Sequence, residues 1–456
     1  MEELIRAGLD VARFNMSHGS HEEHARRLAE TRAAAKAIGK TVGLLADLQG
    51  PKIRLGRFAA GPVELVEGQT FTITIDNILG DVQRCSTTFK GLPADVRPGD
   101  MILIDDGKVQ LEAVSVSDTD VVTKVVVPGP VSNNKGINLP GVAVNVPALS
   151  EKDEDDLRFA LRNNFDLIAL SFVRNAADVT RVREIMAEEG LTLPVIAKIE
   201  KPQAVENLDE IIAAFDAFMV ARGDLGVELP LEFVPMVQKD IISKARIKAK
   251  PVIVATQMLD SMIGSPTPTR AETSDVANAI LDGADAVMLS GETSIGAYPV
   301  KTVATMARII AKTEDLGLDR IQKIDWKLDS VPGAVTISAL NIASIVGATH
   351  VVSGTQSGDT ARRLARYRGQ IPLVAFTPNT KTAHVLTLVW GTQVFRLPGY
   401  KTTEELLHLI DKELVECGVC QPGDRVVVVF GEPIGVPGHT NSLNVHVVQD
   451  VTGKSS

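Results

Sequence analysis

The sequence predicts an α/β fold: a (β/α)8 barrel that is interrupted by an inserted all-β domain and followed by a second α/β domain. Three observations predict it. Short apolar runs alternate with segments of helical spacing in two parts of the chain. Between about residues 55 and 147 the apolar residues instead alternate one by one, as in antiparallel strands. At 456 residues the chain is also too long for one ordinary core.

Composition and charge exclude several classes of protein. The formal net charge of −10 argues against a broad nucleic-acid-binding surface. No apolar run approaches the roughly 18 residues of a membrane span, and the first residues carry no secretion signal. Three cysteines in a chain of this length do not form a disulfide framework. We therefore expect a cytoplasmic protein without nucleic-acid or membrane partners.

The barrel is expected to begin with the end of a helix (2–8), a strand (11–18), a helix (21–38) and a strand (41–50). No strand precedes that first helix, so we expect the first barrel strand to be missing and the strands at 11–14 and 286–289 to have unpaired edges. The favoured interpretation is a true start that lies upstream.

The inserted domain closes near residue 147, and the β/α alternation resumes at Ser150, where SEKDEDDL is a typical helix start. Later barrel strands are predicted at 166–172, 194–200, 217–224, 250–258 and 284–292. Beyond about residue 329 a helix and five further apolar runs predict a separate C-terminal α/β domain. The predicted division assigns 1–54 and 148–328 to the barrel, 55–147 to a β-barrel lid and 329–456 to the C-terminal domain.

The stretch 195–226 reads as a βαβ unit with charged residues where both strands end. Lys198 and Glu200 lie two residues apart, so they share one face of an extended strand. A lysine beside two carboxylates, Glu200 and Asp224, indicates a site for a divalent metal ion and a transferring anion. The alternative is a buried structural ion-pair cluster.

Charged or hydroxylated residues recur where the other predicted strands end. Parallel α/β folds bind ligands at the carboxyl ends of their strands, so these side chains should face one mouth. Cationic groups suit a phosphorylated substrate, and carboxylates suit magnesium. Taken singly, Arg54 could be a solvated linker residue, and Thr256 and Ser290 could be helix caps. The set is Arg13, Asn15, Ser17, Asp47, Arg54, Lys198, Glu200, Asp224, Thr256 and Ser290.

Eight stretches of the sequence are long and specific. They are VARFNMSHG (11–19), DLQGPKIR (47–54), KGINLPG (135–141), AKIEKPQAVEN (197–207), MVARGDLGVELP (219–230), ATQMLDSM (255–262), PTRAETSDVANAILDGADAVMLSGET (268–293) and SGTQSG (353–358). In these stretches, and in their order and spacing, the chain resembles the pyruvate kinases over essentially its full length. The resemblance implies a glycolytic, cytoplasmic homotetramer that transfers a phosphoryl group from phosphoenolpyruvate to ADP. Mg²⁺ would be required, with Mn²⁺ as an alternative.

Carried over position by position, the resemblance also implies roles for single residues. Lys198 would stabilise the transferring phosphoryl group, and Thr256 and Ser290 would help to bring a proton to the enolate carbon. The metal ligands would be Glu200 and Asp224. The substrate-binding set would be Arg13, Lys198, Gly223, Asp224 and Thr256, with backbone amides around 221–223 meeting the substrate carboxylate. The nucleotide-binding set would be Asn15, Met16, Ser17, His18, Arg54 and Lys135.

Two positions depart from the pattern of many pyruvate kinases. Lys52 stands where potassium-dependent members have a glutamate, so its ammonium could replace the potassium ion, and we expect K⁺ not to be required. The potassium ligands would otherwise be Asn15, Ser17, Asp47 and Leu48. In the C-terminal domain, Thr355, Ser357, Gly358 and Thr360 keep a phosphate loop. Asp359 adds a negative charge there, so activation by a sugar bisphosphate is doubtful and the effector stays open.

Two alternatives to an active pyruvate kinase stay open. One is a truncated, inactive relative with a regulatory or ligand-binding role, supported by the missing first strand. The other keeps the barrel but changes the reaction to that of a magnesium-dependent lyase or aldolase acting on pyruvate enolate. Two features favour a nucleotide-dependent enzyme over the lyase. They are the cations Arg13, Arg54 and Lys135, and an inserted domain that could act as a lid.

Overall fold

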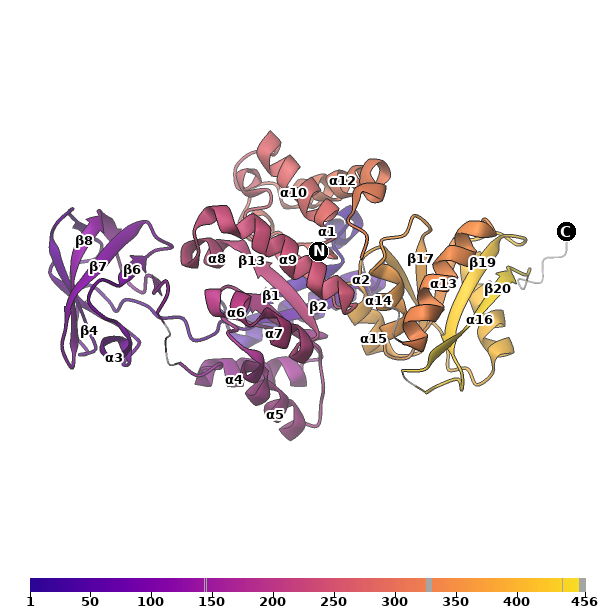
Figure 1. Cartoon of the computed structure of the whole chain (residues 1–456), viewed down its shortest axis with the longest axis horizontal. Helices are drawn as coiled ribbons and strands as arrows, with labels where there is room; N and C mark the ends of the chain where they lie inside the picture. Colours follow the sequence, from indigo (N-terminus) through magenta and orange to yellow (C-terminus); the bar gives the residue numbers. More distant parts are fainter. Residues whose placement is uncertain (143, 145, 325–329, 437, 451–456) are drawn as a thin grey trace.

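The computed structural model describes residues 1–142, 144, 146–324, 330–436 and 438–450. Figure 1 shows three bodies in a row, with the barrel elements between the inserted β domain and the C-terminal α/β domain. Within the described ranges, no helix combines the length and the apolar character needed to cross a bilayer. The domain boundaries given above stay a prediction.

The central body is built on a seven-stranded parallel sheet, which confirms the predicted α/β fold class. Its strands are, in spatial order, β1 (Val11–Asn15), β2 (Gly43–Asp47), β11 (Leu167–Leu170), β12 (Val195–Ile199), β13 (Ala217–Ala221), β14 (Val252–Ala255) and β15 (Ala286–Val287). Every residue of β2, β11, β13 and β14 is buried. Helices cover parallel sheets, so their strands read as continuous apolar runs.

Helices follow the strands around the sheet (Figure 1). The longer ones are α2 (His21–Ala37), α4 (Glu151–Arg162), α5 (Thr180–Glu188), α9 (Val234–Ile247), α10 (Arg270–Asp282) and α12 (Pro299–Gly317). The shorter ones are α1 (Glu2–Ala7), α6 (Pro202–Glu206), α7 (Leu208–Ala214), α8 (Arg222–Glu228), α11 (Gly291–Ser294) and the 3₁₀ turns η1 (Ala176–Val179), η2 (Leu231–Phe233), η3 (Asp260–Ile263) and η4 (Leu318–Arg320). Ser150 caps α4 with a reciprocal capping box, as the acidic helix start predicted.

Two predicted strands are wrong in extent. The strand expected at 217–224 ends at Ala221, and α8 begins at Arg222, so Arg222 and Asp224 lie in the first turn of a helix. The strand expected at 284–292 is limited to Ala286–Val287, and the chain turns at Ser290 into α11. Both segments carry glycine close to the strand end, where the chain can turn into a helix at once.

Glu272 ties the start of α10 to the loop before it. Its carboxylate accepts hydrogen bonds from Ser261 N at 2.7 Å and Ser261 Oγ at 2.6 Å, and from Thr269 N at 2.7 Å. Burial alone would raise the pKa of Glu272, but these hydrogen bonds outweigh burial and lower it. The lowered pKa contributes stability above the unfolded-state pKa of about 4.3, and that stability is lost as the pH falls further.

Glu272→Gln is therefore expected to lower the free energy of unfolding by about 1–2 kcal/mol at pH 7. The gap to wild type should narrow as the pH falls below about 4.3, and it should close once the pH is below the lowered folded-state pKa, where the wild-type carboxylate is protonated as well. Urea unfolding at several pH values measures this. Glu30→Gln, at an exposed position paired with Arg26 at 4.0 Å, is the control and should change the free energy by less than about 0.5 kcal/mol. A gap that persists unchanged at low pH would contradict the role of Glu272.

In its described residues the inserted body is all-β apart from one short helix, α3 (Leu92–Asp95), and it has a hydrophobic core of its own. The larger sheet has the order β10 (Ile137–Asn138), β6 (Met101–Ile104), β7 (Val109–Val116), β8 (Asp120–Val127), β4 (Thr70–Thr74) and β5 (Arg84–Ser86). A second sheet pairs β3 (Val63–Leu65) with β9 (Gly129–Val131). An isolated bridge between Arg54 and Gly136 lies where the insertion leaves and rejoins the barrel.

The C-terminal body has a five-stranded sheet in the order β18 (Thr392–Arg396), β17 (Leu373–Thr377), β16 (His350–Gly354), β19 (Arg425–Gly431) and β20 (Thr440–Val447). Four strands are parallel, and β20 is antiparallel to β19. The helices α13 (Val331–Ile345), α14 (Asp359–Ala365), α15 (Thr380–Leu386) and α16 (Thr403–Glu416) accompany it. Leu388, after α15, packs into a cluster with barrel residues such as Leu45 and Met219, so this body closes one end of the barrel.

Candidate active site

The side chains predicted at strand ends do meet at the carboxyl edge of the barrel sheet. Lys198, on β12, lies between two buried carboxylates: its Nζ is 3.3 Å from Asp47 Oδ1 and 3.0 Å from Glu200 Oε1. The same ammonium donates to Ser171 Oγ at 2.7 Å. Arg13 Nε donates to the other oxygen of Asp47 at 2.6 Å. The two cations and two carboxylates thus come from β1, β2, β12 and the residue just after β12, and β11 lies between β2 and β12 in the sheet.

Burial and charge set the protonation of this cluster. Burial would lower the pKa of Lys198, but Asp47 and Glu200 outweigh burial and raise it, so the ammonium stays charged. Burial would raise the pKa of Asp47, but Lys198 and Arg13 lower it. The pKa of Glu200 is raised by burial, and the nearby Asp224 adds to that effect against the attraction of Lys198. Glu200 is therefore the carboxylate whose negative charge is least compensated.

Glu200 and Asp224 have the chemistry of a divalent-cation site. Both are carboxylates, and the repulsion between them contributes to the raised pKa of Glu200. Glu200 Oε2 accepts the backbone N–H of Phe172 at 2.7 Å, which fixes the carboxylate in place. Among the described residues, no group of three or more His, Cys, Asp and Glu side chains is arranged to hold a metal ion. A magnesium ion here would thus take two protein ligands and complete its shell with substrate or water oxygens.

Thr256 lies just beyond β14 in a left-handed backbone conformation (φ 72°), which is strained for a β-branched residue. Its Oγ1 accepts the backbone N–H of Gly223 at 2.8 Å and donates to Ala255 O at 2.6 Å. Arg222 donates to Thr256 O at 2.7 Å and pairs with Asp275 at 2.7 Å. Hydrogen bonds from Arg222 and Gly223 therefore stabilise the strained turn, and they place Thr256 beside the first turn of α8.

Ser290 lies apart from the Lys198 cluster in the contacts that the structure records. Its N–H donates to the buried Glu292 Oε2 at 2.7 Å, and its carbonyl accepts Ser294 Oγ at 3.0 Å. Glu292 Oε1 also accepts Leu259 N at 3.3 Å, which connects this turn to the segment after Thr256. Ser290 precedes α11 as its N-cap residue, with no side-chain capping hydrogen bond.

The predicted nucleotide residues form two separate groups. In the turn after β1, Asn15 Oδ1 accepts Ser17 N at 3.1 Å, Met16 is buried, and His18 O is 2.8 Å from His24 Nε2. Arg54 and Lys135 instead lie at the junction with the inserted domain. There Arg54 Nη1 donates to Asn134 O at 3.1 Å, and Lys135 Nζ is 3.0 Å from Asp105 Oδ1.

Lys52 lies at that same junction. A Cβ added to Gly136 would be 3.1 Å from Lys52 Cε, so the aliphatic part of Lys52 passes directly over Gly136. Of the predicted potassium ligands, Asp47 is already paired with Arg13 and Lys198, and Leu48 O accepts Ser171 Oγ at 2.7 Å.

The sequence analysis missed several residues of the site. Ser171 and Phe172 end the predicted strand 166–172, so the strand-end argument that selected Lys198 would have found them too. Asn138 was missed for a different reason. It is on β10 of the inserted domain and donates to Glu228 Oε1 at 3.0 Å, which also pairs with Lys201 at 2.5 Å. No sequence pattern joins residues that lie 90 positions apart.

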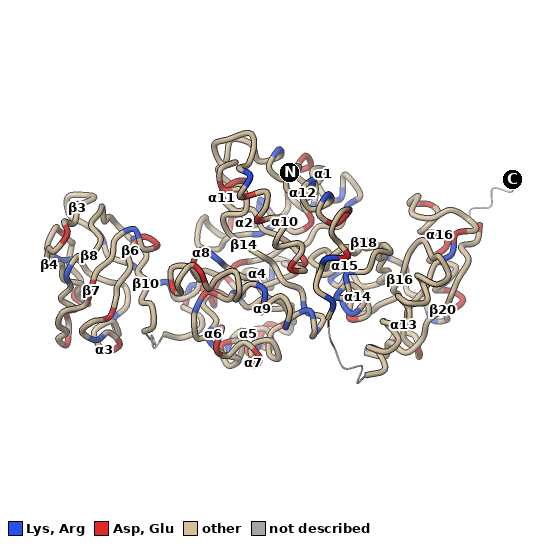
Figure 2. The backbone as a smooth tube through the Cα atoms, turned by 45° about the horizontal axis from the view of Figure 1, so that its top comes forward, with Lys and Arg blue, Asp and Glu red and all other residues tan. Residues whose placement is uncertain are grey.

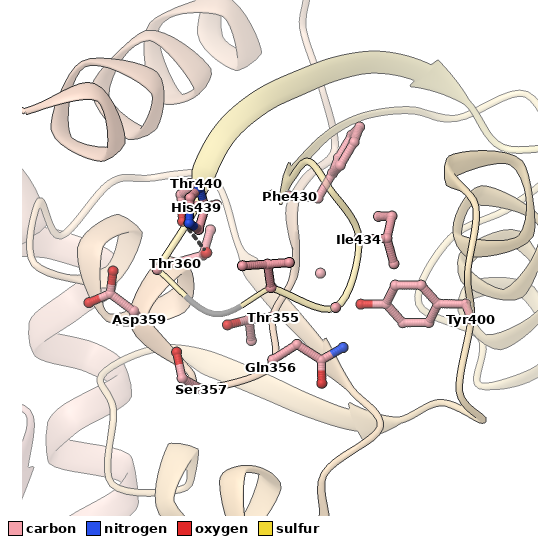
Figure 3. A pocket seen from close by; sticks show the side chains of 15 residues that line it. Thr355, Gln356, Ser357, Asp359, Thr360, Tyr400, Phe430, Ile434, His439 and Thr440 are labelled. Carbon is pink, nitrogen blue, oxygen red and sulfur yellow. Dashed lines mark hydrogen bonds between the residues drawn. The ribbon is translucent and has the colours of Figure 1, made fainter.

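The predicted phosphate loop lines a hollow of about 390 Å³ in the C-terminal domain (Figure 3). Thr355 Oγ1 accepts Gly358 N at 3.0 Å, and the hydroxyls of Thr360 and Thr440 are 2.6 Å apart. Asp359 pairs with Arg363 at 2.6 Å and lies 3.6 Å from Arg362. Two arginines therefore compensate the negative charge that argued against an anion in this loop.

Comparisons with known proteins agree with this arrangement. The family model described as "Pyruvate kinase, barrel domain" matches residues 1–303, and "Pyruvate kinase, alpha/beta domain" matches residues 333–446. A curated pyruvate kinase from Corynebacterium glutamicum is 53% identical over 98% of this chain and 94% of its own length. One from Mycobacterium tuberculosis is 52% identical over 97% of this chain and 94% of its own length.

A solved structure is similar as well. The crystal structure of a pyruvate kinase from Cryptosporidium parvum superposes with a TM-score of 0.91 at 38% identity, covering 98% of this chain and 92% of that one. The relatives match both the barrel and the C-terminal parts, so the inactive-relative alternative is not favoured. The resemblance noted in the sequence is confirmed: the chain belongs to the pyruvate kinase family.

Proposed function

We propose that the chain transfers a phosphoryl group from phosphoenolpyruvate to ADP, giving pyruvate and ATP, at the carboxyl edge of the barrel sheet. The observation that carries the proposal is Lys198, a charged ammonium held between Asp47 and Glu200 with a side chain that is 12% exposed. Phosphoryl transfer needs positioned positive charge more than covalent chemistry. The family match and the full-length relatives support the same reaction.

The proposed mechanism assigns each group one task. Arg13 would hold the phosphoryl end of the substrate, and Lys198 would stabilise the phosphoryl oxygens as the bond to the enolate oxygen breaks and a bond to the ADP oxygen forms. A divalent ion on Glu200 and Asp224 would neutralise oxygen charge on both sides of that transfer. We propose Mg²⁺, with Mn²⁺ as an alternative.

The enolate then takes a proton on carbon to become pyruvate. Thr256 Oγ1 is engaged with Gly223 N and Ala255 O, so we propose that it passes a proton through water rather than directly. Ser290 would order that water from the neighbouring turn. The nucleotide would be held by the turn Asn15–His18, and by Arg54 and Lys135 as the inserted domain closes over it.

A coupled assay tests the proposed function. The purified chain should produce pyruvate from phosphoenolpyruvate only when ADP and a divalent metal ion are both present. A magnesium-dependent lyase would turn over without ADP, and an inactive relative would not turn over at all. Either of those results would overturn the proposal.

We propose that potassium is not required, because Lys52 stands where potassium-dependent members have a glutamate and Asp47 already has two cationic partners. Activity in potassium-free buffer should stay within about threefold of that in potassium chloride at equal ionic strength. The matched variant Lys52→Glu restores the acidic residue of potassium-dependent members, and it should become potassium-dependent. A wild-type rate that falls about tenfold or more without potassium would contradict this proposal.

We also propose a homotetramer in the cytoplasm. Large apolar side chains are exposed on the barrel, at Leu231, Phe233 and Met236, and on the last strand of the C-terminal sheet, at Val445 and Val447. Such patches are typical of protein interfaces. The cysteines Cys85, Cys417 and Cys420 are free, which suits a reducing compartment.

A further inference from the structure

A second cluster of cations lies where the barrel meets the C-terminal domain. An open hollow of about 190 Å³ is lined there by Arg246 and Lys250 from the barrel, and by Arg362, Arg366 and Arg368 from the other domain. Lys250 precedes β14, so the hollow is at the amino end of that strand and opposite the Lys198 cluster. Figure 2 shows Lys and Arg stretches of both domains meeting beside α14.

Positive charge in this hollow is poorly balanced. Asp285 is the one carboxylate among the described lining residues. It is 2.9 Å from Arg368 Nη2, and it accepts the N–H groups of Val252 at 3.0 Å and Trp390 at 3.1 Å.

Two neighbouring carboxylates have their shortest ion pairs with arginines that do not line the hollow. Asp216 is 2.5 Å from Arg183 Nη2, and Asp359 is 2.6 Å from Arg363 Nε. Arg362 is also 3.6 Å from Asp359 Oδ1, so the five lining cations are balanced by Asp285 and, more weakly, by Asp359.

Three of the guanidinium groups are buried, and two of these, Arg246 and Arg368, have a donor without an acceptor among the described residues. Arg246, Arg366 and Arg368 are 3%, 3% and 4% exposed. Arg246 donates to Gln322 O and Arg366 O at 3.1 Å each, and Arg368 donates to Gly283 O at 2.7 Å and Ala365 O at 2.8 Å. These carbonyls are neutral, and the Nε–H groups of Arg246 and Arg368 are buried without an acceptor among the described residues. Buried donors of this kind normally have a partner.

Burial without enough negative charge disfavours the charged forms of four of these side chains. Burial, helped by repulsion from Arg368, lowers the pKa of Arg246 to about 10. Burial also lowers the pKa values of Lys250, Arg362 and Arg366. An anion in the hollow would reduce this penalty, because it would supply negative charge to the buried cations.

We propose that this hollow binds an oxyanion of the phosphate class, as inorganic phosphate or as the phosphoryl group of a small organic monophosphate. Guanidinium forks match the oxygen geometry of phosphate. The bound anion would join the barrel to the C-terminal domain, because its cationic partners come from both. The hollow shares no lining residue with the Thr355 loop of Figure 3.

Thermal unfolding of the full chain tests the proposal, with potassium phosphate compared with potassium chloride at equal ionic strength. About 10 mM phosphate is expected to raise the wild-type Tm by about 3 °C or more. Arg366→Gln should lose at least half of that shift, measured from its own Tm in chloride. Arg362→Gln is the second variant, and it decides the test if Arg366→Gln does not fold. Arg363→Gln is the matched control, because Arg363 is on α14 and pairs with Asp359 without lining the hollow.

Two further arms separate the possible sources of the effect. Ser357→Asp places a charge in the Thr355 loop and should keep the shift; a shift lost in this variant alone would assign the anion to that loop and overturn the proposal. Equal shifts in Arg366→Gln, Arg362→Gln and Arg363→Gln would also overturn it. Glycerol 3-phosphate replaces inorganic phosphate in the last arm. Inorganic phosphate and glycerol 3-phosphate are compared by the rise in Tm that each causes. The compound with the larger rise, provided that the rise is lost in Arg366→Gln, is the form of phosphate that the hollow binds.

Discussion

Lys198→Met is expected to lower kcat by about 10³-fold or more while the chain stays folded. The ammonium of Lys198 is the cation that Asp47, Glu200 and Ser171 hold at the carboxyl edge of the sheet. Methionine keeps the length of the side chain but removes the charge, so the transferring phosphoryl group loses its main stabilising partner. A coupled assay at saturating substrate and magnesium measures the loss.

Removing Lys198 also leaves two buried carboxylates with one cation fewer, and breaking a buried pair costs about 3–5 kcal/mol. The control must therefore cause similar structural damage. Lys201→Met does so, because Lys201 pairs with Glu228 and its side chain is 15% exposed, against 12% for Lys198. Lys201→Met is expected to lose stability as well but to keep kcat within about tenfold.

Comparable losses of kcat in the two lysine variants would mean that folding damage, rather than charge at the reacting phosphoryl group, explains the result. Near-normal turnover in Lys198→Met would refute the role proposed for this residue. Far-UV circular dichroism and the Tm of each variant establish that the assays compare folded proteins.

The second large effect is expected from Glu200→Gln, which should lower kcat/KM about 10²-fold or more and raise the magnesium concentration for half-maximal rate by about tenfold or more. A neutral amide is a poor ligand for a divalent cation that prefers carboxylate oxygens. Thermal stability without metal should change little, because burial already disfavours the charge on Glu200.

Glu228→Gln is the matched control for the metal site. The side chains of Glu200 and Glu228 are both 1% exposed, and each pairs with one lysine. Glu228 lies under the inserted domain and bonds to Asn138, so its loss should leave the magnesium requirement unchanged. A magnesium titration that shifts in Glu228→Gln but not in Glu200→Gln would contradict the proposed ligand set.

The sequence by itself determined the order of the elements and the core of the site. Apolar runs with charged ends identify parallel strands, and residues two apart on a strand share a face. These two rules bring Lys198 and Glu200 together, and the strand-end rule adds Arg13 and Asp47; the structure records all four in contact. Local physics is sufficient there, because chain geometry alone fixes which edge of a parallel sheet those side chains reach.

Strand ends were less predictable. The strands were predicted to continue past Ala221 and Val287, but the backbone turns into helices at Arg222 and Ser290. Hydrophobicity does not distinguish the last residue of a buried strand from the first residue of a buried helix, so the position of Asp224 depended on how α8 packs. The strained turn at Thr256 could not be predicted from the sequence either, because it is stabilised by a hydrogen bond from Arg222, which follows a different strand.

Tertiary structure alone decided which distant residues share a site. Asn138 meets Glu228 across 90 positions, and Arg246 meets Arg366 across 120. Neither pair has a local sequence signature, because each is formed when one domain packs on another. The balance of charge also depended on tertiary structure. In the sequence Asp359 is a negative charge that would repel an anion, but in the structure Arg363 compensates it. The cations around Arg246 repel one another strongly only because they are buried away from water. The sequence determined the chemical character of each side chain, and the packing of the domains determined which residues each side chain contacts.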